Sequence, residues 1–247
     1  MCARCGDAQK GPAGLRVWEQ CRSCRLVPPD FARAVAYGPY QGRMREAIHA
    51  LKYDRVHAAA RGLGSFLAQA IAQMAAEAPA EMLVIPVPLH RTKHAQRGFN
   101  QARSLAVEAL KALRKTHPAW QLRLASKTLM RLRSTESQAG LTPRQRRLNV
   151  RGAFTVTDPA AVIMRHVLLI DDILTTGATA RAAARALVQA GAASVRVATL
   201  ARATRINWTK NEREEITTIE DAGFEEDAPG ENTRKIYAGA SRGQAAF

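Results

Sequence analysis

Val167–Thr179 reads V-L-L-I-D-D-I-L-T-T-G-A-T, and this stretch decides the fold that the sequence predicts. Its first four residues, Val167–Ile170, are a short apolar run of the kind that forms a buried strand. Asp171–Thr179 follows, and after it comes an alanine-rich helix that Gly191 terminates. In an open α/β sheet, ligands bind beyond the carboxyl ends of the strands. We therefore expect Asp171–Thr179 to be a ligand-binding loop between a strand and a helix.

The residue types of this loop suit a sugar phosphate. Asp171 and Asp172 are adjacent carboxylates that can accept hydrogen bonds from vicinal hydroxyl groups. The turn after them offers hydroxyls and backbone N–H groups to a phosphate at the helix N-terminus, and its residues are Thr175, Thr176, Gly177, Ala178 and Thr179. The alternative is an ordinary helix start with threonine caps and solvated aspartates. The succession of an apolar strand, two acids and a T-T-G-A-T turn favours the ligand site.

Strands and helices alternate along the rest of the chain before residue 205. Apolar runs predict further strands, and 3.6-residue periodicity predicts amphipathic helices. The strands are expected at Arg33–Tyr37, Met82–Pro88 and Val195–Leu200, and the helices at Gly42–Leu51, Arg61–Glu77 and Gln101–Lys115, with a further helix start at Thr142. A basic loop is expected after Pro88. This alternation predicts an α/β fold with a parallel or mostly parallel sheet covered by helices on both faces.

All four cysteines lie near the N-terminus, in two C-x-x-C pairs, and they are Cys2, Cys5, Cys21 and Cys24. This spacing is typical of a structural zinc site with four thiolate ligands. Two disulfides are the alternative, which the reducing cytoplasm expected for this chain disfavours. The module then either stabilises the fold or contacts nucleic acid or a partner.

The chain carries 37 Lys plus Arg against 21 Asp plus Glu, a formal net charge of +16 over 247 residues. This excess excludes an acidic protein and indicates an anionic partner, which could be nucleic acid, membrane lipid or a phosphorylated small molecule. No apolar run approaches the roughly 18 residues of a membrane span, so no span is expected. Much of the excess lies in residues 91–103 and 127–151, whereas residues 205–247 hold 6 basic and 9 acidic residues. We expect a cysteine module at 1–30, an α/β domain at 31–204 and a disordered acidic tail at 205–247.

The run Val167–Thr179 resembles the phosphoribosyl pyrophosphate motif of type I phosphoribosyltransferases. Other motifs narrow the resemblance to the ComF (competence protein F) family of phosphoribosyltransferase-like proteins, over about residues 1–203. These motifs are Cys2–Cys24, Ile48–Tyr53, Pro86–Pro88, Arg97–Gln101, Ser137–Leu141 and Arg147–Val150. The resemblance implies a type I phosphoribosyltransferase-like sheet with an N-terminal zinc finger.

The resemblance also implies roles for single residues. Asp171 and Asp172 would hold the ribose hydroxyls of phosphoribosyl pyrophosphate, Thr175–Thr179 would cradle its 5′-phosphate, and Mg²⁺ would bridge its pyrophosphate. The basic loop would bind the pyrophosphate through Arg91, Arg97 and Asn100. Arg131 and Arg133 would lie on a mobile hood that closes over the site. Lys52 either reaches the pyrophosphate or is a surface charge that compensates the helix dipole.

Two classes of function remain open from the sequence. The first is an enzyme that transfers a phosphoribosyl group to a nitrogenous acceptor, or a former enzyme that still binds the donor. The second is an accessory factor that binds single-stranded DNA through the zinc module and the basic loops. The resemblance implies a process, DNA uptake in natural transformation, in which DNA-uptake proteins are candidate partners. The tail after residue 204 is either a solvated extension, which is favoured, or a competitor for a basic site.

Overall fold

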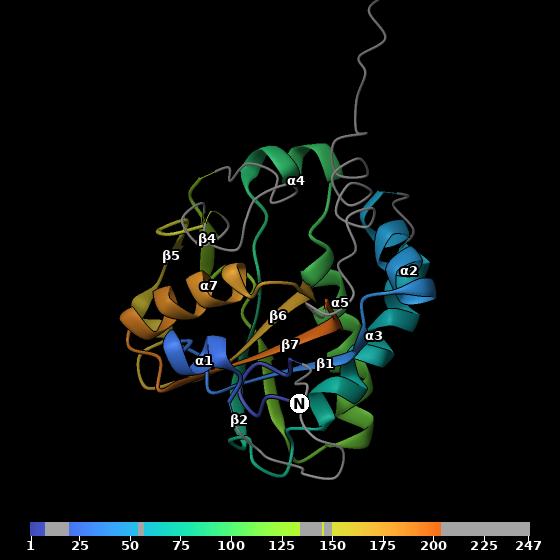
Figure 1. Ribbon diagram of the computed structural model, residues 1–247. Helices are drawn as coiled ribbons and strands as arrows, with labels where there is room; N and C mark the ends of the chain where they lie inside the picture. Colours follow the sequence, from blue (N-terminus) through green and yellow to red (C-terminus); the bar gives the residue numbers. More distant parts are fainter. Residues whose placement is uncertain (8–19, 54–56, 134–144, 146–149, 204–247) are drawn as a thin grey trace, which may run out of the picture.

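The computed structural model describes residues 1–7, 20–53, 57–133, 145 and 150–203 of the chain (Figure 1). Its centre is a parallel sheet of five strands in the order β1-β7-β6-β2-β3. These strands are β1 (Arg33–Pro39), β2 (Glu81–Pro86), β3 (Gln121–Leu124), β6 (His166–Leu174) and β7 (Ser194–Arg202). The α/β fold with a parallel sheet, predicted from the sequence, is confirmed.

Two layers of other elements cover this sheet (Figure 1). One face packs against α2 (Gly42–Tyr53), α3 (His57–Ala72) and α5 (Gln101–Thr116), and we call it the helix face. The other packs against the cysteine segment, α1 (Arg22–Leu26), α7 (Ala178–Gln189) and a small antiparallel sheet of β4 (Leu129–Arg131) and β5 (Phe154–Val156). We call this second face the cysteine face, and the β4–β5 sheet the hood.

The apolar run before the two acids is buried on both sides. Leu168 and Ile170 pack into the core of the helix face, whereas Val167 and Leu169 pack into the core of the cysteine face. All four side chains are 0% exposed. A central parallel strand is covered on both faces, so it needs a continuous apolar run and not an alternating one.

Close packing of α3 on α5 completes the helix face. A Cβ atom added at Gly64 of α3 would lie 2.3 Å from Cβ of Glu108 in α5. No real side chain could occupy that space, so glycine allows the two helix backbones to approach each other. The fully buried side chains of Ile48, Leu67 and Leu105 fill the layer between these helices and the sheet.

After the neighbouring strands β2 and β6, the chain continues to opposite faces of the sheet. The chain leaves β2 for α5 on the helix face, and it leaves β6 for α7 on the cysteine face. Their register pairs Pro86 with Ile170 at the carboxyl ends. Where two adjacent parallel strands diverge in this way, a crevice opens beyond their ends, and ligands of α/β proteins bind there.

Several boundaries differ from the sequence prediction. The second predicted helix begins earlier and ends earlier, because α3 covers His57–Ala72. The short elements α1, β3, β4 and β5 were not predicted. The predicted helix start at Thr142 and the acidic tail lie outside the described residues. Within the described part of the chain, no helix combines the length and the apolar character that crossing a membrane requires.

Candidate functional site

The two acids lie in the strand and not in a loop, which corrects the sequence prediction. Strand β6 continues to Leu174, because Asp171 pairs with Thr199 and Leu174 with Arg202 in the parallel ladder to β7. Asp171 is half-buried and Asp172 is only 6% exposed. The loop therefore begins at Thr175, and the carboxylates are held by the sheet itself.

Local hydrogen bonds orient both carboxylates. The backbone N–H of Asp172 donates to Oδ1 of Asp171 over 2.9 Å, and the N–H of Ile173 donates to Oδ1 of Asp172 over 2.9 Å. Charge-assisted bonds of this kind stabilise the ionised form of a carboxylate and restrict its rotamers. Two oriented acids at the crevice can therefore accept hydrogen bonds from a polyhydroxylated ligand.

The turn that follows, Thr175–Thr179, leads directly into α7, and we call it the threonine turn. Gly177 has φ 75°, in the left-handed region, and it is the N-cap residue of α7. Its carbonyl accepts from the N–H of Arg181 over 2.9 Å, and Oγ1 of Thr176 accepts from the N–H of Ala178 over 3.3 Å. Ala178 is buried, whereas the three threonines are half-buried. The turn thus lies at the N-terminus of a twelve-residue helix, where the positive end of the helix dipole favours an anion.

The chain after β2 lies beside the acids. The N–H of Val87 donates to the carbonyl of Ile170, the residue before Asp171, over 2.8 Å. Asn100, the N-cap residue of α5, holds this segment in place. Its Nδ2 donates to the Val87 carbonyl over 3.0 Å, and its Oδ1 accepts from the Arg103 N–H over 3.1 Å. The structure therefore gives Asn100 a capping and bridging role, and its predicted contact with a ligand stays a prediction.

A short helix replaces the basic loop that the sequence predicted after Pro88. This helix, α4, covers Arg91–Arg97 and lies beyond the carboxyl end of the sheet (Figure 1). The His90 side chain caps it by accepting from the Thr92 N–H over 3.3 Å, and Gly98 ends it with φ 75°. Gly98 after the segment was the signal for this helix in the sequence, because histidine is not among the preferred N-cap residues. Arg91 is exposed at the first position of α4, and Arg97 is half-buried at its last.

The hood brings one of its two predicted arginines toward the acids. Burial lowers the pKa of Arg131, and the negative charge of Asp171 opposes that shift. The Arg131 guanidinium also lies over the ring of Phe154, 5.5 Å from its centroid, on the neighbouring strand of the hood. Arg133 instead donates to the backbone carbonyl of Arg151 within the hood. The side chain of Lys52 lies outside the described residues.

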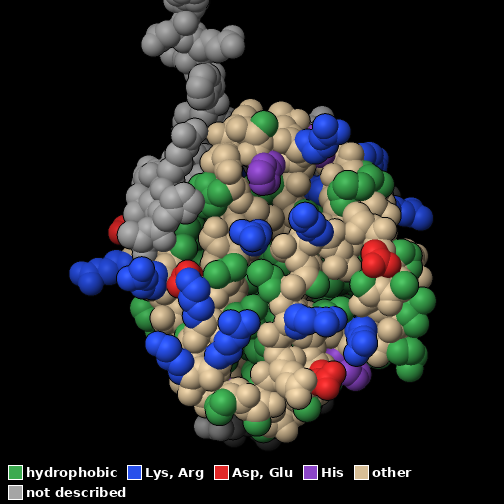
Figure 2. Space-filling model, turned by 180° about the vertical axis from the view of Figure 1, so that it is seen from behind, with side chains coloured by type: hydrophobic (Ala, Val, Ile, Leu, Met, Phe, Trp, Pro, Cys, Tyr) green, Lys and Arg blue, Asp and Glu red, His purple; other side chains and the backbone are tan. Residues whose placement is uncertain are grey.

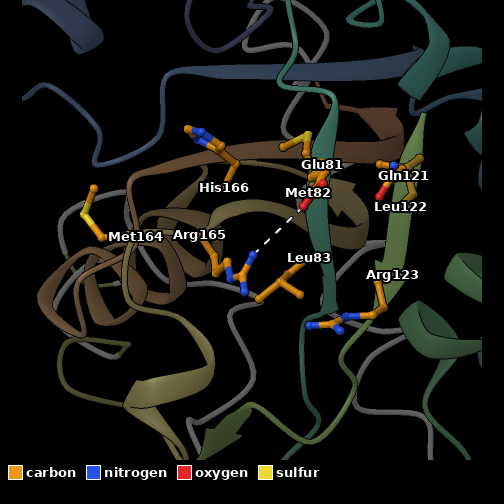
Figure 3. Close-up of a pocket in the computed structure, with 9 residues that line it drawn as sticks. All are labelled: Glu81, Met82, Leu83, Gln121, Leu122, Arg123, Met164, Arg165 and His166. Carbon is orange, nitrogen blue, oxygen red and sulfur yellow. Dashed lines mark ion pairs between the residues drawn. The ribbon is translucent and has the colours of Figure 1, made fainter. Parts of the chain in front are cut away.

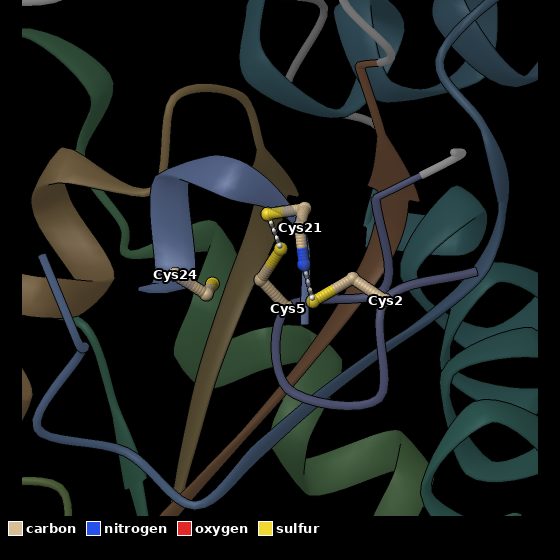
Figure 4. A group of neighbouring side chains, drawn as sticks. All are labelled: Cys2, Cys5, Cys21 and Cys24. Atoms are coloured by element: carbon tan, nitrogen blue, oxygen red, sulfur yellow. Dashed lines mark hydrogen bonds between the residues drawn. The ribbon is translucent and has the colours of Figure 1, made fainter. Parts of the chain in front are cut away.

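The four cysteines form a cluster on the cysteine face (Figure 4). Their sulfur atoms all lie within 4.8 Å of one another, and Sγ of Cys5 lies 3.7 Å from Sγ of Cys21. Four sulfurs at about 2.3 Å from a central zinc ion would be about 3.8 Å apart, whereas a disulfide bond is about 2.05 Å long. The backbone N–H of Cys21 donates to Sγ of Cys2 over 3.3 Å. The geometry therefore fits one tetrahedral metal ion, and the cluster could hold zinc.

The environment of these thiols also fits a metal. Burial raises the pKa of Cys5 and raises the pKa of Cys24 to about 11. Burial opposes ionisation of Cys2 as well, but N–H donors from Cys21, Cys5 and Arg4 lower the pKa of Cys2 to about 7. Four buried thiolates repel one another, so a divalent cation is the natural group to compensate their charge.

A separate cavity of about 560 Å³ lies at the other end of the sheet (Figure 3). Glu81, Gln121 and His166, the first residues of β2, β3 and β6, contribute to its lining, together with Arg123 and Arg165. Parallel strands place their amino ends together, so this cavity lies at the edge opposite Asp171. The acids, the threonine turn and the helix N-terminus are all at the carboxyl edge, and we place the candidate site there.

Acids at the end of β6, a turn at a helix N-terminus and an arginine-bearing hood over a parallel sheet define a phosphoribosyltransferase-like protein. Comparison with known proteins agrees with this class. The family profile described as "Phosphoribosyl transferase domain" matches residues 104–228.

Curated relatives narrow the family further. DNA utilization protein YhgH of Salmonella typhi is 31% identical over 204 residues, which cover 82% of this chain and 84% of that protein. Competence protein F of Haemophilus influenzae is 27% identical over 205 residues, covering 82% and 84%. Competence protein ComFC of Bacillus subtilis is 37% identical over 121 residues, covering 49% and 44%. The chain therefore belongs to the phosphoribosyl transferase domain family, and within it to the ComF group, which confirms the resemblance predicted from the sequence.

Proposed function

We propose that this protein binds phosphoribosyl pyrophosphate together with magnesium at the carboxyl end of β6. One observation carries the proposal. Two oriented carboxylates, Asp171 and Asp172, stand two residues before the threonine turn at the N-terminus of α7, and the strand that carries them pairs with the end of β2. Hydroxyl groups of a ribose suit the first feature, and a phosphate suits the second.

The donor would be held from several sides. The carboxylates accept from the ribose hydroxyls, and the backbone N–H groups of the threonine turn donate to the 5′-phosphate. Arg91 and Arg97, on a helix without a single acid, supply positive charge for the pyrophosphate. Magnesium prefers oxygen ligands of this kind, and when bound it would neutralise charge on the pyrophosphate.

Arg131 would act in closure of the site. The negative charge of Asp171 favours the charged form of Arg131, so this hood arginine lies near the acids. Closure excludes water, which would otherwise hydrolyse the donor. In a transfer reaction, pyrophosphate leaves the anomeric carbon with its electron pair and a nitrogenous acceptor bonds to that carbon. Cationic groups stabilise the leaving pyrophosphate, and no side-chain nucleophile is needed.

The names of the relatives suggest the process. Proteins of this group are called DNA utilization and competence proteins, and the chain covers 84% of two of them. We therefore propose that donor binding by this protein serves DNA uptake. Zinc in the cysteine cluster would have a structural role, because four sulfur ligands leave no open coordination position.

Single-stranded DNA is the second candidate ligand. Lysine and arginine side chains are spread over one face of the molecule with few acids among them (Figure 2). If these side chains bind DNA phosphates, affinity must fall with salt, with a log–log slope of about −0.7 for each neutralised phosphate. A flat dependence would exclude this function.

Calorimetric titration with magnesium and phosphoribosyl pyrophosphate tests the first proposal. The wild type is expected to bind, and Asp171→Asn plus Asp172→Asn to bind about hundredfold or more weakly, because two charge-assisted hydrogen bonds are lost. Asp30→Asn plus Asp158→Asn is the matched control, because it also removes two negative charges. Asp30 pairs with Arg185, and Asp158 accepts a hydrogen bond from the Ala161 N–H, which asparagine can also accept. Absence of binding by the wild type, or equal binding by the double variant, would overturn the proposal.

A further inference from the structure

Arg181 contacts both the candidate donor site and the cysteine cluster. Its backbone N–H donates to the carbonyl of Gly177 over 2.9 Å and so closes the first turn of α7. Its side chain points the other way: Nη1 donates to the Val27 carbonyl over 2.6 Å, and Nη2 approaches Sγ of Cys24 at 3.8 Å. One residue therefore links the threonine turn to a metal ligand 157 positions earlier in the chain.

The side chain of Arg181 contacts the α1 segment, which carries two of the four cysteines. Cys21 is the N-cap residue of α1, Cys24 lies within this helix, and Val27 is its C-cap residue. Cys24 is 0% exposed and Arg181 is half-buried, so the contact between them is partly shielded from water. A metal ion that joins Cys21 and Cys24 to the first cysteine pair would fix α1, and with it the carbonyl and the sulfur that Arg181 contacts.

A second arginine makes the equivalent link on the other side of the turn. Arg202, the last residue of β7, approaches Sγ of Cys5 at 3.7 Å through Nη2 and pairs with Asp7 at 3.5 Å. Its side chain is only 11% exposed. Arg202 is the register partner of Leu174, the residue immediately before the threonine turn. The turn is thus flanked by the backbones of two arginines, each of which directs its guanidinium group at a cluster sulfur.

We propose that the metal-loaded cysteine cluster positions the threonine turn through Arg181 and Arg202, so that loss of the metal weakens donor binding. This inference rests on the proposed function for its ligand. A metal ion with four thiolate ligands carries net negative charge, which attracts guanidinium groups, and groups around a metal site commonly orient it in this way. Arg181 and Arg202 are positioning residues, because they reach the donor site only through the backbone of the turn.

Arg185 offers a matched control on the same helix. It lies one turn beyond Arg181, is also an arginine at the surface of the cysteine face, and pairs with Asp30 at 3.1 Å. Its side chain thus contacts a carboxylate outside the cluster. Arg181→Gln and Arg185→Gln remove the same charge from the same helix, but only the first removes a link between the turn and a sulfur.

The first test measures donor affinity by calorimetry, with zinc bound and after removal of zinc by a chelator. In the wild type and in Arg185→Gln, zinc removal is expected to weaken binding of the magnesium donor by about tenfold. In Arg181→Gln with zinc bound, affinity is already reduced, and zinc removal has a clearly smaller effect because the link is absent. Coupling is reciprocal, so the donor should raise zinc affinity by the same factor, which competition with the chelator measures. Arg181→Gln with wild-type affinity and full zinc dependence would overturn the proposal.

The second test needs no donor, which separates failure of this inference from failure of the proposed function. Hydrogen exchange of the Arg181 amide reports the first turn of α7, and the amides of β2 in the central sheet report global unfolding. With zinc bound, Arg181→Gln should exchange faster than Arg185→Gln at α7 and equally at β2. Zinc removal from the wild type should raise exchange at α7. Equal α7 exchange in the two zinc-loaded variants would overturn the coupling, whether or not the wild type binds the donor.

Discussion

The two faces of the central sheet are held by different means. The helix face packs three helices of 12 to 16 residues against the strands, with a core of fully buried aliphatic side chains. Among the described residues, the cysteine face is covered by one long helix, α7, and by shorter pieces: a five-residue helix, the hood and the cysteine segment. Short elements bury little apolar surface, so we expect a metal ion in the cysteine cluster and the arginine contacts to stabilise this face in addition to packing. The proposed donor site lies where the chain enters this second face, so we expect its integrity to depend on the cluster.

The largest effect is expected from breaking the cluster. Cys24→Ser replaces a fully buried thiol ligand with a poorer one. We expect loss of bound zinc, a drop of several kcal/mol in the free energy of unfolding, and weaker donor binding, since metal binding contributes to folding energy. Zinc content by mass spectrometry and denaturant unfolding measure these changes. Full zinc occupancy in the variant would show that Cys24 is not a ligand.

The matching experiment on the helix face creates a cavity in the core of that face. Leu67→Ala in α3 removes a side chain that is 0% exposed, and it should lower the free energy of unfolding by about 2–5 kcal/mol. Because this residue belongs to the other core, zinc content and donor affinity should not change in the folded protein. Loss of zinc in Leu67→Ala would mean that the two faces are not independent.

The two ends of α7 give a finer comparison within the cysteine face. Gly177 and Gly191 flank the helix and both have positive φ, 75° and 93°. Alanine should cost about 1–2 kcal/mol in unfolding free energy at Gly177, and more at Gly191, where a Cβ atom would lie 3.0 Å from Cγ1 of Ile163. Only Gly177→Ala should also weaken donor binding, by about tenfold, which corresponds to one hydrogen bond to a charged group. Equal donor affinities in the two variants would argue against a phosphate at this turn.

The smallest of these effects concerns Asn100, which joins the residue after β2 to the N-terminus of α5. Asn100→Ala loses the cap of α5 and the bond to Val87, and it should lower the unfolding free energy by about 1–2 kcal/mol. Asn100→Ser restores the cap but not the bond to Val87, so it should recover part of that loss. Chemical denaturation measures both, and unchanged stability in the alanine variant would contradict the bridging role.

The main strands and helices of the fold could be predicted because each depends on a pattern of neighbouring residues. The apolar run Val167–Ile170 and the turn after it were enough to predict a parallel strand, a loop and a helix. The end of the strand was missed, since carboxylates are disfavoured in strands and only pairing with β7 extends β6 to Leu174. Tertiary pairing overrode propensity at the two residues that we propose to hold the ligand.

Contacts between distant residues could not be predicted in the same way. The hood pairs Leu129 with Val156 through strands of three residues each, too short for any periodicity. The contact of Arg181 with Cys24 joins positions with no pattern in common. The cysteine spacing predicted a metal site, and the structure brings the four sulfurs together, but the arginines around it emerge only from the fold.

The most direct test of the central claim locates the donor by nuclear magnetic resonance. Magnesium phosphoribosyl pyrophosphate is added to labelled protein, and the shifts of backbone amide signals are followed. We expect the largest shifts at Gly177 and Ala178 and none at Glu81 and His166, which line the cavity at the opposite edge of the sheet. Shifts confined to that opposite edge, or no shifts at a saturating donor concentration, would contradict this claim.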